Sequence, residues 1–124
     1  MMDQSKAKIL IVDDQIDLTM LIKEELEEKN YQVLTAGNGQ EALDIIAHEG
    51  LPQLILLDMN MPVMNGWTFS QKFTDIYGRA CPIVIMTAAD DSPTRAMEIG
   101  ADSYLGKPFE FETLNKTVES MLPQ

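Results

Sequence analysis

Five polar residues of this sequence stand at the ends of short apolar runs, and their types suit phosphoryl chemistry. They are Asp13, Asp14, Asp58, Thr87 and Lys107. Three carboxylates brought together repel one another unless a cation lies between them. Mg²⁺ fits such a site, because it binds through one or two carboxylates and keeps positions open for phosphate oxygens. We therefore expect a magnesium site, with Mn²⁺ as a possible substitute.

The same set contains a nucleophile and the groups that would assist it. A carboxylate such as Asp58 can attack phosphorus and form an acyl phosphate, a reaction that mainly needs positioning and charge neutralisation. Lys107 and the cation would supply positive charge, and Thr87 can donate a hydroxyl hydrogen bond to the phosphoryl group. A zinc site is not expected, because the sequence has one cysteine and one histidine.

These residues meet only if the apolar runs form one parallel sheet. Runs rich in Ile, Leu and Val alternate with stretches of helical period, which is typical of a parallel sheet covered on both faces. The predicted strands are 8–12, 31–36, 54–58, 83–87 and 103–105. In a doubly wound sheet of order 2-1-3-4-5, the carboxyl ends of the first and third strands are neighbours. The three carboxylates would then crowd together, so removing one, such as Asp13, should relieve repulsion.

Helices are predicted between and after the strands. The signals are apolar residues at helical spacing, the Asn38-Gly39 turn, Pro93 in a first helical turn and Gly100 as a stop. The predicted helices cover about 15–29, 39–48, 67–77 and 92–99, and a fifth carries Leu114, Val118, Met121 and Leu122. The predicted fold class is therefore α/β, with five strands and five helices.

Length and composition limit the class of protein. The 124 residues suit one domain, residues 1–124. A formal net charge of -11 repels phosphate backbones and argues against nucleic acid as a partner. No apolar run approaches the roughly 20 residues of a membrane span, and the start lacks the features of a secretory signal, so a cytoplasmic location without membrane attachment is expected. We expect Cys81 to be a packed residue and His48 to be solvated.

Four segments of the sequence resemble the receiver domains of two-component response regulators. They are IVDDQ (11–15), LLDMNMPVMNGW (56–67), IMTAAD (85–90) and GADSYLGKPFE (100–110). The segments occur in the family's order and the resemblance covers essentially the whole chain. The chain is similar to a stand-alone receiver of the chemotaxis-regulator kind, and this resemblance implies a flavodoxin-like fold.

The resemblance assigns a role to each residue of the set. It implies that Asp58 is the phosphoacceptor and that Asp13 and Asp14 hold magnesium together with Asp58 and the backbone carbonyl of Asn60. It implies that Thr87 and Lys107 contact the phosphoryl group. It also implies that Tyr104 changes rotamer with Thr87 on activation, and that the Lys107-Pro108 bond is cis.

The implied partners are proteins. The phosphoryl donor would be a histidine kinase or a histidine phosphotransfer protein, and the chain would be a signalling receiver that assists its own phosphoryl transfer and dephosphorylation. Because the sequence ends with the fifth helix, output would be direct binding of a target or relay of the phosphoryl group, unless the chain is excised from a longer protein. The expected output face is the fourth helix, fifth strand and fifth helix, where we expect Arg95, Glu98, Tyr104 and Phe111 to change. Oligomeric state stays open.

Three other functions share parts of this pattern. In phosphatases of the haloacid-dehalogenase kind, the nucleophile is the first residue of an Asp-x-Asp motif on the first strand. This sequence reads Asp13-Asp14-Gln15 at that position. A flavodoxin needs a hydroxyl- and glycine-rich phosphate loop, and DDQID (13–17) has the opposite charge character. A third alternative is a binding module that works without phosphorylation. The presence of all five polar residues argues against it, and titration with a small phosphodonor tests it.

Overall fold

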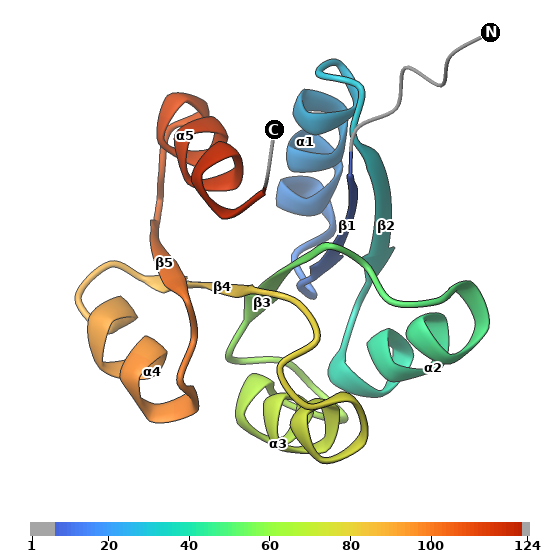
Figure 1. Ribbon diagram of the computed structural model, residues 1–124. Helices are drawn as coiled ribbons and strands as arrows, with labels where there is room; N and C mark the ends of the chain where they lie inside the picture. Colours follow the sequence, from blue (N-terminus) through green and yellow to red (C-terminus); the bar gives the residue numbers. More distant parts are fainter. Residues whose placement is uncertain (1–6, 123–124) are drawn as a thin grey trace, which may run out of the picture.

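The computed structural model describes residues 7–122, in which strands and helices alternate along the chain (Figure 1). The order is β1 (Lys8–Val12), α1 (Ile16–Glu27), β2 (Gln32–Ala36), α2 (Gly39–Glu49), β3 (Leu54–Asp58), α3 (Gly66–Tyr77), β4 (Ile83–Ala88), α4 (Ser92–Ile99), β5 (Ser103–Lys107) and α5 (Phe111–Met121). The alternation of apolar runs with helical periods is confirmed. Element ends differ from the predictions by a few residues.

The five strands form one parallel sheet in the order β2-β1-β3-β4-β5, as predicted. Strand β3 is buried at every residue, because its apolar side chains meet helices on both faces. Strands β4 and β5 run further than predicted, since Thr87 pairs with Gly106 and Ala88 with Lys107. Backbone pairing continues there after the apolar run has ended, so Ala88 and Lys107 belong to the strands themselves.

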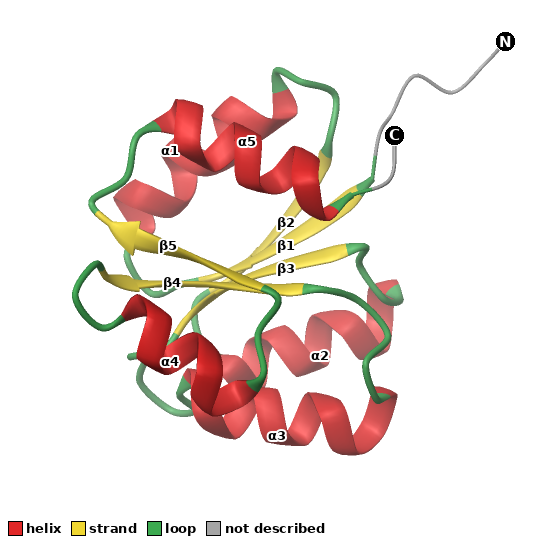
Figure 2. Cartoon of the chain, turned by 60° about the vertical axis from the view of Figure 1, so that its left-hand side comes forward, coloured by secondary structure: helices red, strands yellow, loops and turns green. Residues whose placement is uncertain are grey.

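Helices cover both faces of the sheet, α1 and α5 on one side and α2, α3 and α4 on the other (Figure 2). Successive strand residues point to opposite faces, so Ile9 and Ile11 pack with α1 and α5, and Leu10 and Val12 pack with the other three helices. The result is two apolar cores separated by the sheet. Among residues 7–122, no helix is both long enough and apolar enough to cross a membrane.

Two glycines allow close approaches that shape the carboxyl edge of the sheet. A Cβ on Gly66 would lie 2.8 Å from the carbonyl oxygen of Asp58, so α3 can begin directly against the end of β3. A Cβ on Gly106 would lie 2.6 Å from the Cα of Ala89, where the segment after β4 passes over β5. Side chains at either position would push these segments apart.

The segment between β3 and α3 contains a strained turn. Val63 has a φ of 65°, and the N–H of Met64 donates to the carbonyl of Pro62 at 2.6 Å, which closes a three-residue turn. Met64 is buried and its carbonyl accepts from the N–H of Gly39 at 3.0 Å. The anchored Met64 thus holds Val63 in a backbone region that β-branched residues rarely adopt.

We predict that Val63→Asn raises the free energy of unfolding by about 1 kcal/mol, because asparagine adopts positive φ more readily than a β-branched residue. Little packing would be lost, since Val63 is 83% exposed. Thermal or urea unfolding measures the change. Val63→Ile, which keeps the β-branch, is the control and should show no gain; equal stability of the Asn and Ile variants would contradict the assignment of strain to this residue.

Candidate functional site

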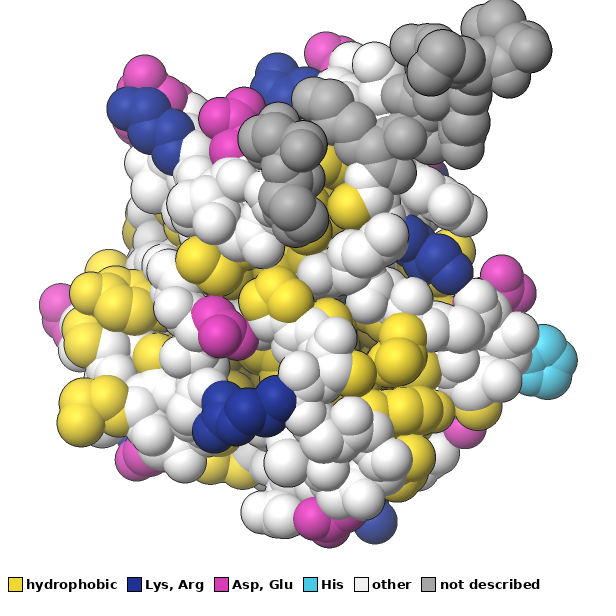
Figure 3. Space-filling model, in the orientation of Figure 1, with side chains coloured by type: hydrophobic (Ala, Val, Ile, Leu, Met, Phe, Trp, Pro, Cys, Tyr) yellow, Lys and Arg dark blue, Asp and Glu magenta, His cyan; other side chains and the backbone are white. Residues whose placement is uncertain are grey.

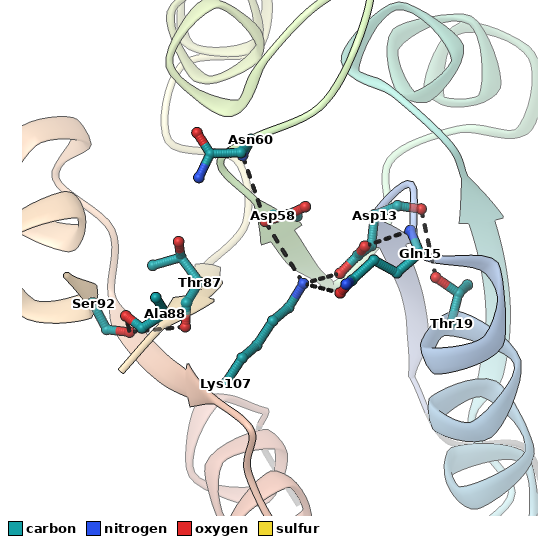
Figure 4. A network of polar contacts seen from close by, with 9 residues as sticks. All are labelled: Asp13, Gln15, Thr19, Asp58, Asn60, Thr87, Ala88, Ser92 and Lys107. Atoms are coloured by element: carbon teal, nitrogen blue, oxygen red, sulfur yellow. Dashed lines mark hydrogen bonds and ion pairs between the residues drawn. The ribbon is translucent and has the colours of Figure 1, made fainter. Parts of the chain in front are cut away.

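The polar residues singled out in the sequence meet at the carboxyl edge of the sheet. Asp13 follows β1, Asp58 ends β3, Thr87 lies near the end of β4 and Lys107 ends β5. Figure 4 shows Asp13, Asp58 and Lys107 pointing toward one another from these strand ends. Their approach follows from strand order, because β1 and β3 are paired neighbours and β5 is the edge strand beyond β4.

Three carboxylates form the acidic part of the site. Asp13, Asp14 and Asp58 each offer an oxygen, and these atoms all lie within 4.8 Å of one another. Asp13 and Asp58 are buried, whereas Asp14 is exposed. Hard oxygen donors with one side open to solvent fit a divalent cation such as Mg²⁺ and do not suit a soft metal. The structure thus brings together the three carboxylates that the sequence predicted.

Lys107 supplies the positive charge at this edge and has three acceptors around it. Its Nζ lies 2.8 Å from Asp13 Oδ2, 2.7 Å from Gln15 Oε1 and 3.7 Å from Asp58 Oδ1. The contact with Gln15 was not predicted from the sequence. Glutamine is not a favoured residue at a helix N-cap, so its place before α1 is the one local feature of the sequence that indicates another role for Gln15. Nothing in the local sequence points to a partner 92 residues away.

Burial and the neighbouring carboxylates both act on Asp58. Burial raises the pKa of Asp58 to about 6, and the nearby Asp13 carboxylate adds to the rise, against the opposing effects of Lys107 and the Asn60 N–H. Asp13 is better compensated, because one oxygen accepts from the Gln15 N–H at 2.8 Å and the other from Lys107. Removing Asp13 would therefore also remove a buried ion pair, so relief of repulsion is better tested at Asp58.

Thr87 is buried beside the site, and its hydroxyl makes no hydrogen bond within residues 7–122. Its backbone carbonyl accepts from the hydroxyl of Ser92 at 3.3 Å, and the carbonyl of Ala88 accepts from the same hydroxyl at 3.1 Å. Ser92 is fully buried at the start of α4 (Figure 4). The end of β4 is thus joined to α4, while the Thr87 hydroxyl stays available to a ligand.

The other predicted site residues lie around this centre. Asn60 is exposed, and its N–H faces Asp58 Oδ1 at 3.5 Å. Tyr104 lies on β5, 47% exposed, and lines a surface cavity together with Pro93 and Met97 of α4. The Lys107-Pro108 bond is cis, as the family resemblance implied.

Two residues of the expected output region, Arg95 and Glu98, face α3 instead of Tyr104. The Trp67 indole N–H donates to Glu98 at 2.8 Å, the Arg95 guanidinium lies 5.4 Å from the Trp67 ring centroid, and Arg95 pairs with Glu98 at 2.9 Å. The indole N–H is the main cause that lowers the pKa of Glu98. Helix α4 therefore presents one side to α3 and another side to β5.

Two further predictions concern residues outside this chemistry. Cys81 is half-buried, and burial raises the pKa of its thiol to about 11, with a smaller contribution from Asp102, so the reactive thiolate is disfavoured. His48 is exposed near the end of α2, as expected, and is the one cyan side chain of Figure 3. On that face of the molecule, Lys and Arg side chains stand apart from one another.

Comparison with known sequences places residues 9–119 in the family "Response regulator receiver domain". The chain is 36% identical to the sporulation initiation phosphotransferase F of Bacillus subtilis, over 94% of both chains. It is 38% identical to a probable transcriptional regulator, ycf27, of Cyanophora paradoxa, over 98% of this chain and 50% of the relative. The chain spans about half the length of several curated relatives that it matches.

Solved structures with the same fold lead to the same family. The chemotaxis protein CheY4 of Vibrio cholerae has a TM-score of 0.83 at 33% identity, over 95% of this chain and 100% of that one. The response regulator TrrA of Thermotoga maritima, solved in complex with Mg²⁺ and BeF, has a TM-score of 0.82 at 32% identity, over 94% of this chain and 100% of that one.

We predict that Asp58→Asn stabilises the protein at pH 7 when a chelator removes divalent cations. The pKa of Asp58 rises from 3.8 to about 6 on folding, so the folded state holds an extra proton between these pH values and stability falls as pH rises through this window. At pH 7 the cost is on the order of 3 kcal/mol, which the uncharged amide would remove. Chemical unfolding at several pH values should show this gain shrinking as pH falls from 6 toward 4.

Asp75→Asn, which changes an exposed carboxylate of α3, is the matched control. The difference between the two variants isolates the contribution of the buried site. An equal effect of Asp58→Asn at pH 4 and pH 7 would contradict the proposed electrostatics.

Proposed function

The chain belongs to the response regulator receiver domain family, and we propose that it accepts a phosphoryl group on Asp58 from a histidine kinase or a histidine phosphotransfer protein. Receiver domains are signalling modules of two-component systems, phosphorylated on an aspartate and served by such donors. We treat residues 1–124 as one such domain. The observation that carries the proposal is the approach of Lys107 and two further carboxylates to the buried Asp58.

The transfer step uses Asp58 as the nucleophile. A carboxylate oxygen of Asp58 forms a bond to phosphorus as the bond from phosphorus to the donor's imidazole nitrogen breaks. The electron pair leaves with that nitrogen, which takes up a proton from solvent, and an acyl phosphate remains on Asp58. Because the attacking group must be ionised, a pKa of about 6 means that, before a cation binds, the nucleophilic form of Asp58 predominates only above that pH.

The surrounding residues stabilise the charge that the phosphoryl group brings. We propose that Asp13, Asp14, Asp58 and the backbone carbonyl of Asn60 hold Mg²⁺, with Mn²⁺ as a substitute; the ion would neutralise charge on the carboxylates and on phosphoryl oxygens. Lys107 would bind a phosphoryl oxygen from the β5 side. The Thr87 hydroxyl, which lacks a hydrogen-bond partner within residues 7–122, would donate to another.

We predict that incubation with acetyl phosphate and Mg²⁺ adds one phosphoryl group to the protein, because the nucleophile and the neutralising charges are in place. Intact-mass measurement follows the adduct. Asp58→Asn, or an excess of chelator with the unchanged protein, should prevent it. A full adduct on the Asn variant, or one that forms undiminished in chelator, would contradict the mechanism. No adduct on the unchanged protein would favour a module that binds without phosphorylation.

We propose further that the output face consists of α4, β5 and α5. On this face Tyr104 and Met97 are large apolar side chains open to solvent. A Thr87 hydroxyl drawn toward a phosphoryl group would leave space into which Tyr104 can turn, and the Ser92 hydroxyl ties the same strand end to α4. The change would alter what the face presents to a partner protein. Two forms of output fit the relatives. A phosphotransferase is consistent with relay of the phosphoryl group, and transcriptional regulators are consistent with direct binding of a target.

Amide NMR spectra with Mg²⁺ alone and with Mg²⁺ plus beryllofluoride test this face, since the fluorine atoms stand in for phosphoryl oxygens on Asp58. We expect shifts around Tyr104 and in α4 as well as in the loops after the strands. Thr87→Ala should lose the distant shifts and keep those near Asp58. Shifts confined to the loops of the unchanged protein would mean that it accepts phosphoryl groups without switching, which favours relay.

A further inference from the structure

Gln15 stands next to the acidic pair of the site, and its side chain does not serve its own helix. It is the N-cap residue of α1, yet its side chain makes no capping hydrogen bond. Instead its carbonyl Oε1 accepts from the Lys107 ammonium at 2.7 Å, across 92 residues of sequence (Figure 4). Hydrogen bonds that involve an ionised group are stronger than those between neutral groups. An exposed glutamine thus gains a specific partner inside the site.

The ammonium has three N–H donors, and their use fixes its orientation. One donor is used by Asp13 Oδ2 at 2.8 Å and one by Gln15 at 2.7 Å. Asp58 Oδ1 lies at 3.7 Å, too far for a hydrogen bond but on the remaining side of the nitrogen. A phosphoryl oxygen on Asp58 extends beyond the carboxylate and would come within reach of the third donor. Two acceptors therefore aim the lysine at the position where the phosphoryl group arrives.

The two acceptors differ in one respect that gives Gln15 its own role. Asp13 is one of the three carboxylates that could hold a metal ion, so its charge would be shared between the ion and Lys107. The Gln15 carbonyl is uncharged and lies outside that set, so its hold on the ammonium does not depend on the cation. The Gln15 N–H also donates to Asp13 Oδ1 at 2.8 Å, which fixes the neighbouring acceptor.

We propose that Gln15 is a positioning residue that keeps the Lys107 ammonium directed at the phosphoryl group when Asp13 is engaged with a cation. The inference rests on the proposed function of Asp58 and adds a residue to it. Gln15 acts through Lys107 and does not touch the reacting atoms.

The test compares the unchanged protein with Gln15→Met, which has a similar reach and replaces the carbonyl oxygen with a thioether sulfur, a much weaker acceptor. With acetyl phosphate and Mg²⁺, the maximal phosphorylation rate should fall about five-fold, as expected for loss of one partly exposed hydrogen bond to a charged group. The donor concentration at half-maximal rate should change little. Beryllofluoride should bind more weakly by a similar factor, while Mg²⁺ affinity measured without phosphodonor stays the same. Gln40→Met, at an exposed glutamine of α2, is the matched control.

A second readout reports the hydrogen bond without any phosphoryl transfer. Solvent exchange of the Lys107 ammonium protons, followed by ¹⁵N NMR, should be slow in the unchanged protein with Mg²⁺ and fast in Gln15→Met. Gln15→Glu keeps an acceptor oxygen at the same reach and should restore slow exchange. Equal melting temperatures would confirm that these changes are local.

The outcomes separate this inference from the proposed function. If the unchanged protein is labelled on Asp58 and Gln15→Met matches it in rate and in beryllofluoride affinity, the positioning role is wrong and the proposed function stands, whatever the exchange rates show. If the unchanged protein accepts no phosphoryl group, both the proposed function and the positioning role are wrong. Slower labelling of Gln15→Met with unchanged exchange at Lys107 would overturn the route through the lysine.

Discussion

Repulsion between buried carboxylates at the ends of β1 and β3 is the interaction on which the rest of the site depends. The two strands are paired neighbours in the centre of the sheet, so Asp13 and Asp58 are held close together whether or not their charges are compensated. Lys107 reduces the repulsion without removing it, since it is bound to Asp13 and lies 3.7 Å from Asp58. Burial, with a further contribution from the Asp13 carboxylate, raises the pKa of Asp58 to about 6. Such a site favours any ligand that brings positive charge or shares the negative charge, which is the physical basis for a divalent cation here.

The fold tolerates this arrangement because the apolar parts of the strands stabilise it. Residues of β1 and β3 contribute to two separate cores, one under α1 and α5 and the other under α2, α3 and α4. Unfavourable electrostatics at one edge is therefore offset by burial along the rest of each strand. Close approaches at Gly66 and Gly106 keep the loops tight over that edge, and the strained turn at Val63 lies in the same region. Backbone strain and uncompensated charge thus both lie near the carboxyl edge of the sheet, where a ligand could relieve them.

Helix α4 is attached both to the end of β4 beside the site and to α3. Its first residue, Ser92, is bound to the end of β4 beside Thr87, and its later turns contact Trp67 of α3 through Glu98 and Arg95. Its third side, with Met97, is open to solvent next to Tyr104. A change in position of the Thr87 strand end would act on one of these attachments, while the contact with α3 would resist it. The balance between the two attachments would set how readily the output face changes.

The five strands, their helices and the acidic and basic residues at the strand ends could be predicted from the sequence, because apolar periodicity and turn residues are local properties of a chain. Strand order 2-1-3-4-5 and the meeting of Asp13, Asp14, Asp58 and Lys107 followed from that pattern and from the family resemblance, and the structure agrees. Four features came from the packing of the chain: β5 continues to Lys107, Gln15 binds this lysine, Glu98 faces Trp67, and burial raises the pKa of Asp58. Each of these depends on how far a side chain reaches between elements distant in sequence, and on how much solvent the packed elements exclude. Neither quantity is a property of a local stretch of residues.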